Sequence, residues 1–164
     1  PARIFFEFAA DGCSDAPDPI MDRHLADPQQ TLDFGRELAG GLRFGAVVAL
    51  CGGLGSGKTC FTQGLVAGLG SAAVVTSPTF TLVHEYGGGR LEVAHFDFYR
   101  VGSAAELVAA GWDDYLDHAG VVVAEWADRF PQLLPTDSTW WRFEHEGQGR
   151  VARPVAAPGR PPGC

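Results

Sequence analysis

The chain has 164 residues, of which 46% are hydrophobic and 20% are charged, a length and composition typical of one globular domain. Its formal net charge of −8 argues against tight direct binding to RNA or DNA, because phosphate contacts require a basic face. The chain has no apolar run long enough to span a bilayer and no secretory pattern at its N-terminus, so we expect a cytoplasmic protein that binds no membrane.

Composition at the two ends of the chain suggests where the folded domain lies. Residues 1–20 run from a short apolar start into Asp, Gly, Ser and Pro, and we expect a mobile N-terminal extension there. A first strand over residues 3–8 remains open as an alternative. We place the domain at residues 21–146. Residues 147–164, rich in Gly, Pro, Ala and Arg, are expected to form a disordered C-terminal tail.

The first elements follow in helix and strand order. Asp27 and Pro28 resemble an N-cap followed by a proline in the first turn, and apolar residues then recur at helical spacing to about Gly40. Residues 46–50 form a short apolar run, typical of a buried strand. The pattern over 58–69 predicts a helix, which Gly70 closes.

The second half of the chain predicts further strands. Runs at 81–86 and 91–99, separated by GGGR, indicate a β-hairpin. Residues 103–110 predict a short helix, 112–116 another turn, and 120–126 and 138–144 two strands. Strand alternation predicts that one of Trp140 and Trp141 lies in the core and the other on the surface. Together the patterns predict an α/β fold, a P-loop NTPase-like three-layer sandwich whose mixed central sheet includes an antiparallel hairpin.

The strongest motif is the run from residue 52 to residue 59, which fits G-x-x-x-x-G-K-[ST] between a predicted strand and a predicted helix. Glycines let backbone N–H groups turn inward around an anion, and the following helix points its positive end at the same place. Lys58, the chain's single lysine, is expected to reach the β and γ phosphates, and the Thr59 hydroxyl to coordinate Mg²⁺. The predicted phosphate-binding residues are Gly52, Gly53, Leu54, Gly55, Ser56, Gly57, Lys58 and Thr59.

A phosphate loop also requires a carboxylate on the metal side. Asp97 ends one predicted strand and is the first candidate, while Glu125 ends another and is the second. Ligands bind beyond the carboxyl ends of strands in open α/β sheets, so both carboxylates are suitably placed. We therefore predict Lys58, Asp97 and Glu125 as catalytic residues, and Thr59, Asp97 and Glu125 as magnesium ligands.

Several classes of P-loop protein are disfavoured by missing motifs. The chain contains no asparagine, which excludes the N-K-x-D guanine motif, and it lacks the L-S-G-G-Q motif of transporter ATPases. No arginine cluster marks the lid of a small kinase. The four cysteines form no C-x-x-C pair, and His84 and His95 have no partners at metal-ligand spacing, so we expect these histidines to be structural or solvated.

Four segments in order resemble the TsaE family, bacterial ATPases needed to make threonylcarbamoyladenosine in tRNA. They are LCGGLGSGKTCF at 50–61, SPTFTLVHEY at 77–86, HFDFYR at 95–100 and AEW at 124–126. The chain departs from the family pattern at Gly53, Ser56 and Cys60, where Asp, Ala and a hydroxyl residue are usual. A thiol is a weak hydrogen-bond donor, so a contact from Cys60 to the α phosphate would be weaker than one from a hydroxyl.

The resemblance implies roles and partners. Asp97 would hold Mg²⁺, Glu125 would lie at the metal or orient the attacking water, and Trp126 and Cys60 would line the nucleotide pocket. Thr79 would belong to a switch-like segment near the γ phosphate. The implied cofactors are ATP or ADP and Mg²⁺. The implied partners are TsaD and TsaB, with tRNA reached only through that complex and no contact with DNA.

The function expected from the sequence is therefore an ATPase that is slow alone and acts with TsaD and TsaB in tRNA modification. Two alternatives remain open. One is a small-molecule kinase of the P-loop class, and the other is a module that binds ATP or ADP without hydrolysing it.

Overall fold

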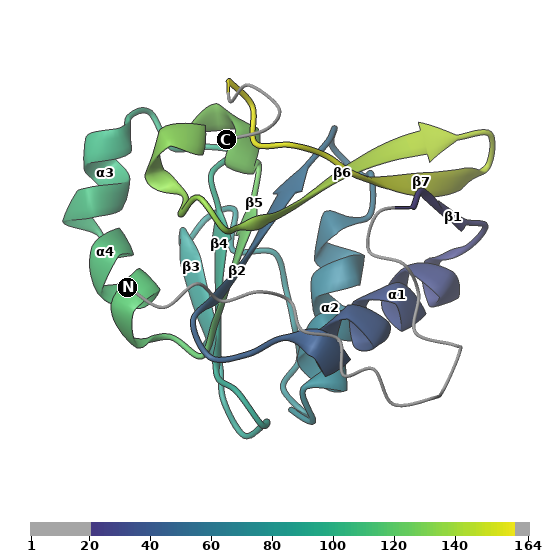
Figure 1. Ribbon diagram of the computed structural model, residues 1–164, viewed down its shortest axis with the longest axis horizontal. Helices are drawn as coiled ribbons and strands as arrows, with labels where there is room; N and C mark the ends of the chain where they lie inside the picture. The colour runs from purple at the N-terminus through teal and green to yellow at the C-terminus, as the bar shows by residue number, and fades with distance from the viewer. Residues whose placement is uncertain (1–20, 160–164) are drawn as a thin grey trace.

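The computed structural model describes residues 21–159, and the predictions for residues 1–20 and for 160–164 fall outside this range. Seven strands form one sheet, with helices on both of its faces (Figure 1). In chain order the elements are β1 Arg23–Leu25, α1 Pro28–Gly41, β2 Ala46–Cys51, α2 Lys58–Gly68, β3 Val83–Tyr86, β4 Val93–Asp97, α3 Ala104–Ala109, α4 Trp112–His118, β5 Val121–Glu125, η1 Ala127–Arg129, η2 Pro131–Leu133, β6 Thr139–Glu146 and β7 Gly149–Pro154.

The sheet is mixed, in the order β1-β7-β6-β2-β5-β4-β3. The central strands β6, β2, β5 and β4 are mutually parallel, whereas β3 pairs antiparallel with β4 and forms the predicted hairpin. At the other edge β7 pairs antiparallel with both β6 and β1. The predicted fold class, with its antiparallel hairpin, is therefore confirmed.

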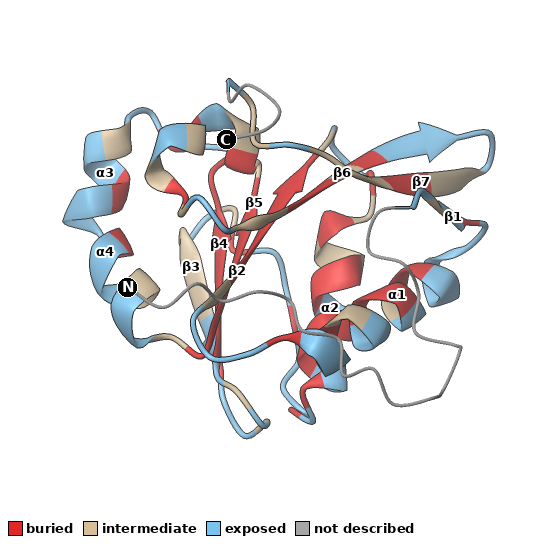
Figure 2. Cartoon of the chain, viewed as in Figure 1, coloured by how far each residue is buried: buried red, intermediate tan, exposed pale blue. Residues whose placement is uncertain are grey.

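Two apolar clusters lie on opposite faces of the sheet and explain the three layers. On one face α1 and α2 pack against the sheet through residues such as Phe34, Phe61 and Leu65. On the other face α3 and α4 contribute Leu107 and Trp112. Figure 2 shows the resulting burial along the central strands between the two helical layers. A strand of a parallel sheet covered on both faces consists of nearly continuous apolar residues, as residues 46–50 do.

The sequence correctly located several local signals. The Asp27 side chain accepts a hydrogen bond of 2.8 Å from the backbone N–H of Gln30, so it caps α1 as predicted, with Pro28 at the first turn. At the start of α3, the N-cap residue Ser103 makes no side-chain cap bond. Glu106 instead accepts a bond of 2.9 Å from the N–H of Gly102.

Two expectations were wrong. Gly149–Pro154 is not a tail but strand β7, which pairs with β6 and carries β1 on its outer edge, so the domain extends past residue 146. Trp140 and Trp141 are both buried, because adjacent side chains of β6 point to opposite faces and helices or turns cover each one. None of the helices in the described residues is long and apolar enough to cross a membrane.

Candidate functional site

The phosphate loop joins the end of β2 to the start of α2. Gly52 has φ +126° and Gly57 has φ +105°, a region that favours glycine. A Cβ at Gly52 would lie 2.0 Å from the carbonyl oxygen of Phe143 on β6, so the neighbouring strand leaves no room for a side chain. These two glycines of the motif are therefore fixed by backbone geometry and packing. Backbone N–H groups at such a turn and helix N-terminus suit an anion.

Lys58 lies across this loop and is only 4% exposed. Its Nζ donates hydrogen bonds to the carbonyl oxygens of Gly52 at 2.8 Å and Gly53 at 2.9 Å. The ammonium also lies 4.2 Å from the ring centroid of Trp126, which follows β5. Burial lowers the pKa of Lys58 from its usual 10.5, and the nearby carboxylates of Glu125 and Asp97 oppose that shift. The site therefore holds a partly desolvated cation beside a loop whose geometry suits an anion.

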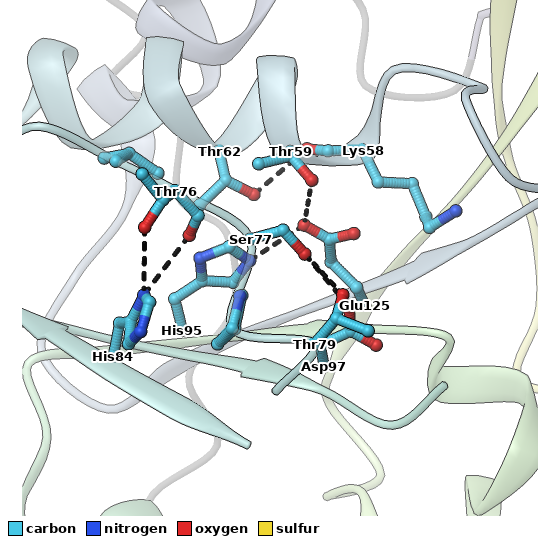
Figure 3. A network of polar contacts seen from close by, with 12 residues as sticks. Lys58, Thr59, Thr62, Thr76, Ser77, Thr79, His84, His95, Asp97 and Glu125 are labelled. Carbon is cyan, nitrogen blue, oxygen red and sulfur yellow. Dashed lines mark hydrogen bonds and ion pairs between the residues drawn. The ribbon is translucent and has the colours of Figure 1, made fainter. Parts of the chain in front are cut away.

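Glu125 is the carboxylate that reaches the first turn of α2. Its Oε1 accepts a hydrogen bond of 2.8 Å from the Thr59 hydroxyl, and His95 Nε2 lies 2.9 Å from the same oxygen (Figure 3). This contact follows from topology, since β5 is the immediate parallel neighbour of β2. The second candidate from the sequence therefore lies closer to Thr59 than the first.

Asp97 is the last residue of β4, one strand further from the loop than β5. It pairs in register with Glu125 of β5. Its Oδ2 accepts hydrogen bonds from the hydroxyls of Ser77 and Thr79, and its Oδ1 accepts one of 2.8 Å from the N–H of Tyr99. Asp97 therefore holds the segment predicted to be switch-like, and both carboxylates lie at the same edge of the sheet.

The donor set suits Mg²⁺ bound together with a nucleotide. Thr59, Asp97 and Glu125 offer hydroxyl and carboxylate oxygens, the ligands that this hard cation prefers. No group of three or more His, Cys, Asp or Glu within residues 21–159 could hold a metal by itself. Magnesium commonly takes one or two protein oxygens and completes its shell with phosphate and water, so this arrangement fits.

The remaining predicted residues differ in their surroundings. Gly53, Leu54 and Gly55 are exposed at the outer turn of the loop, and the Ser56 hydroxyl lies 3.4 Å from Lys58 Nζ. The Cys60 thiol contacts the carbonyl of Pro28 on α1 at 3.4 Å, and burial raises its pKa. Trp126 has φ +57° and packs against Tyr99 with ring centroids 4.9 Å apart. Strained backbone of this kind clusters at functional sites.

Two residues at the site were missed by the sequence analysis. His95, expected to be structural or solvated, contacts Glu125. Because His95 lies two residues before Asp97 on one strand, alternation could have placed both on the same face. Arg150 lies on β7, and its Nε and Nη2 donate to the carbonyl of Gly55 at 3.2 and 3.1 Å. The turn residues 147–149 after a predicted strand were the available hairpin signal.

Comparison with known proteins gives the relationship directly. The family model described as "Threonylcarbamoyl adenosine biosynthesis protein TsaE" matches residues 25–154. The chain belongs to the TsaE family. It is 39% identical over 110 residues to the TsaE protein of Bacillus subtilis, an alignment covering 67% of this chain and 68% of that one. It is 42% identical over 107 residues to the Treponema pallidum TsaE protein, covering 65% and 78%.

A solved structure is also similar to this chain in fold and sequence. The crystal structure of Bacillus subtilis YdiB matches with a TM-score of 0.71 and 30% identity, covering 84% of this chain and 85% of that one. The TsaE match at 25–154 includes all of β7 and, from β1, only its last residue, Leu25. Strand β7 of the edge hairpin β6–β7, which the sequence predicted to be a tail, is therefore inside the region matched by the family.

Proposed function

We propose that this TsaE-family protein binds ATP and Mg²⁺ and hydrolyses ATP during formation of N6-threonylcarbamoyladenosine in tRNA. The observation that carries the proposal is the convergence of Lys58, Thr59 and Glu125 at the end of β2 and β5. This arrangement is the one expected of a phosphate site with a metal side.

Each residue has a distinct task in this proposal. The Lys58 ammonium would leave the carbonyls of Gly52 and Gly53 and contact the phosphates, whose charge compensates for its burial. The Thr59 oxygen would face the cation while its hydroxyl still donates a hydrogen bond to Glu125. Bound Mg²⁺ would supply charge neutralisation of the transferred phosphoryl group. Asp97 would keep the segment of Ser77 and Thr79 close to the site, and Glu125 would orient water from its free oxygen.

Partners are part of the proposal. We propose that the protein works with TsaD and TsaB in the cytoplasm, is slow alone, and meets tRNA only through the complex. Large apolar side chains near the site support a docking role, since Leu54 is 78% exposed and Phe80 is 83% exposed. Arg100 lies over the Phe80 ring, 4.3 Å from its centroid. Exposed apolar residues with an arginine are typical of interface cores.

The test is phosphate release from Mg-ATP by the protein alone and with purified TsaB and TsaD from the same source. We expect strong stimulation by the pair, and loss of release in Lys58→Ala with the fold intact by circular dichroism. A Lys58→Ala variant with full turnover would contradict the phosphate site. A phosphorylated small molecule in place of free phosphate would indicate a kinase. Tight nucleotide binding with no release, even with both partners, would indicate a sensing module.

A further inference from the structure

His95 is a buried polar side chain beside the proposed metal side of the site. It lies on β4, has 0% exposure, and places Nε2 2.9 Å from Oε1 of Glu125 (Figure 3). The side chains of His95, Asp97 and Glu125 project from the same face of the sheet. His95 and Asp97 are two residues apart on β4, and Asp97 pairs in register with Glu125 on the parallel strand β5. His95 belongs to the HFDFYR segment, but it has no role in the proposed function as described above.

Glu125 has one oxygen that is doubly used. Oε1 accepts from the Thr59 hydroxyl and lies beside His95, whereas Oε2 has no hydrogen-bond partner among the described residues. Two donors on one oxygen fix the rotation of the carboxylate about its last bond. They leave Oε2 as the oxygen available to a metal-bound water or to the attacking water. Donors that hydrogen-bond to the residues holding a metal commonly tune the affinity of the site.

The other ring nitrogen indicates which way the hydrogen bond runs. Nδ1 of His95 is buried without a hydrogen-bond partner in the part of the chain that the structure describes. An ionised carboxylate can only accept, so we place a proton on Nε2, from which the ring donates a hydrogen bond to Glu125. If this position contributed only to packing, Leu or Phe would be more favourable there, because neither buries an unpaired nitrogen.

The ring is also held in place from the outside. Tyr86 on β3 packs against it, with ring centroids 6.1 Å apart. The Tyr86 hydroxyl in turn donates to the carbonyl of Thr76 at 3.0 Å, directly before the segment that Asp97 holds. The imidazole therefore has a fixed position between β3 and β5, as a positioning group requires.

We propose that His95 is a positioning residue for the metal side of the phosphate site, acting through Glu125 without touching the nucleotide. Its Nε2–H holds the Glu125 carboxylate in the rotamer that serves Thr59 with one oxygen and the magnesium shell with the other. This inference rests on the proposed Mg-nucleotide function and adds a residue to it.

The test compares His95→Gln with His95→Leu and His95→Asn. Gln can place an amide N–H where Nε2 lies, Leu cannot donate, and Asn donates but does not reach Glu125. ADP affinity is measured by calorimetry in EDTA and across a Mg²⁺ titration. We expect His95→Leu and His95→Asn to raise the Mg²⁺ concentration for half-maximal effect about tenfold, the lower end of the range for losing a hydrogen-bond partner of a metal ligand. ADP affinity in EDTA should stay within about twofold, and His95→Gln should restore most of the Mg²⁺ response.

A double variant separates action through Glu125 from general damage. In a Glu125→Gln background, His95→Leu should produce no further change in the Mg²⁺ response, because the two residues act as one unit. A His95→Leu protein with the wild-type Mg²⁺ titration would overturn the inference, as would an additive effect in the double variant. If His95→Leu does not fold, the contrast between Asn and Gln decides. Wild-type protein that binds ADP without any Mg²⁺ response would overturn both this inference and the proposed metal site.

Discussion

Thr59 and Glu125, 66 positions apart in the chain, are joined by a hydrogen bond of 2.8 Å from the threonine hydroxyl to Oε1 of the carboxylate. The bond connects the first turn of α2 with the last residue of β5 across two neighbouring parallel strands. The hydroxyl proton is directed at Glu125, so the lone pairs of the Thr59 oxygen remain available to a cation.

Removal of that hydroxyl should therefore weaken the metal response. We expect Thr59→Val to raise the Mg²⁺ requirement for ADP binding by at least about tenfold, because the proposed oxygen ligand is lost. ADP affinity in EDTA should change little. Thr62→Val is the matched control, one turn further along α2. Within residues 21–159 the Thr62 hydroxyl bonds only to the carbonyl of Lys58, at 3.1 Å. An equal shift in both variants, measured by calorimetry, would contradict the assignment.

Gly52 should be far less tolerant of substitution than Gly53. Gly52→Ala brings a Cβ to 2.0 Å from the carbonyl oxygen of Phe143 and forces φ +126° on a residue with a side chain. Left-handed backbone costs about 1–2 kcal/mol and overpacking about 1–3 kcal/mol, so we expect a loss of more than about 2 kcal/mol in the free energy of unfolding.

The matched variant is Gly53→Ala, where an added Cβ meets no atom within 4 Å. We expect a change of at most about 0.5 kcal/mol, as at other exposed positions. Urea unfolding of both proteins checks the pair. Similar midpoints for the two variants would mean that β6 moves aside to accept the methyl group.

The elements that the sequence predicted well are those defined by local patterns. The cap at Asp27, the glycine-rich loop and the apolar strand 46–50 each carry their signal within a few residues. Strand β7 does not, because RVARP acquires its conformation from pairing with β6, and its Gly, Arg and Pro content resembles a tail. Pairing between strands is non-local, so composition alone could not find it.

The site shows the same division between local and non-local information. Both carboxylates could be placed at strand ends, but the strand order could not be read from the chain. The order places β5, not β4, next to β2, and this decides that Glu125 contacts Thr59 while Asp97 holds Thr79. Trp140 and Trp141 were mispredicted for a related reason, since the layer covering the second face of β6 is built from distant segments.

Arg150 on β7 should contribute to nucleotide binding through the phosphate loop. Its guanidinium holds the carbonyl of Gly55 with two hydrogen bonds of 3.2 and 3.1 Å, and no carboxylate within the described residues forms an ion pair with it. We expect Arg150→Ala to weaken ADP binding about fivefold, equivalent to a loss of about 1 kcal/mol of loop ordering.

Arg153 on the same strand is the control for this variant. It pairs with Asp22 and Glu144 instead of the loop. Arg153→Ala should leave ADP affinity unchanged while shifting thermal unfolding by an amount similar to Arg150→Ala. Equal losses of ADP affinity in the two variants would show that damage to the edge hairpin, not the contact with Gly55, is responsible.

Through Lys58, alkaline pH should change two properties in opposite directions. The free energy of unfolding of the nucleotide-free protein should gain a contribution, and nucleotide affinity should fall. Because burial lowers its pKa from 10.5, the unfolded chain holds this proton at pH values where the folded chain has released it. The contribution of Lys58 to the free energy of unfolding therefore rises with pH between the lowered pKa and 10.5. Nucleotide affinity should fall over the same window, since the phosphates then meet a neutral amine.

Calorimetric titration of ADP from about pH 8 to about pH 10, within the range where lysine titrates, checks the second trend. Proton uptake on binding should grow with pH in the wild type, because the bound polyanion restores the charge of Lys58. Lys58→Met keeps the length of the side chain without the amine, and its unfolding free energy should lack the rise assigned to Lys58. Since Lys58 is the single lysine, the difference between the two proteins isolates its titration from that of the tyrosines and cysteines. An ADP affinity that stays flat to about pH 10 would mean that the ammonium does not contact the phosphates.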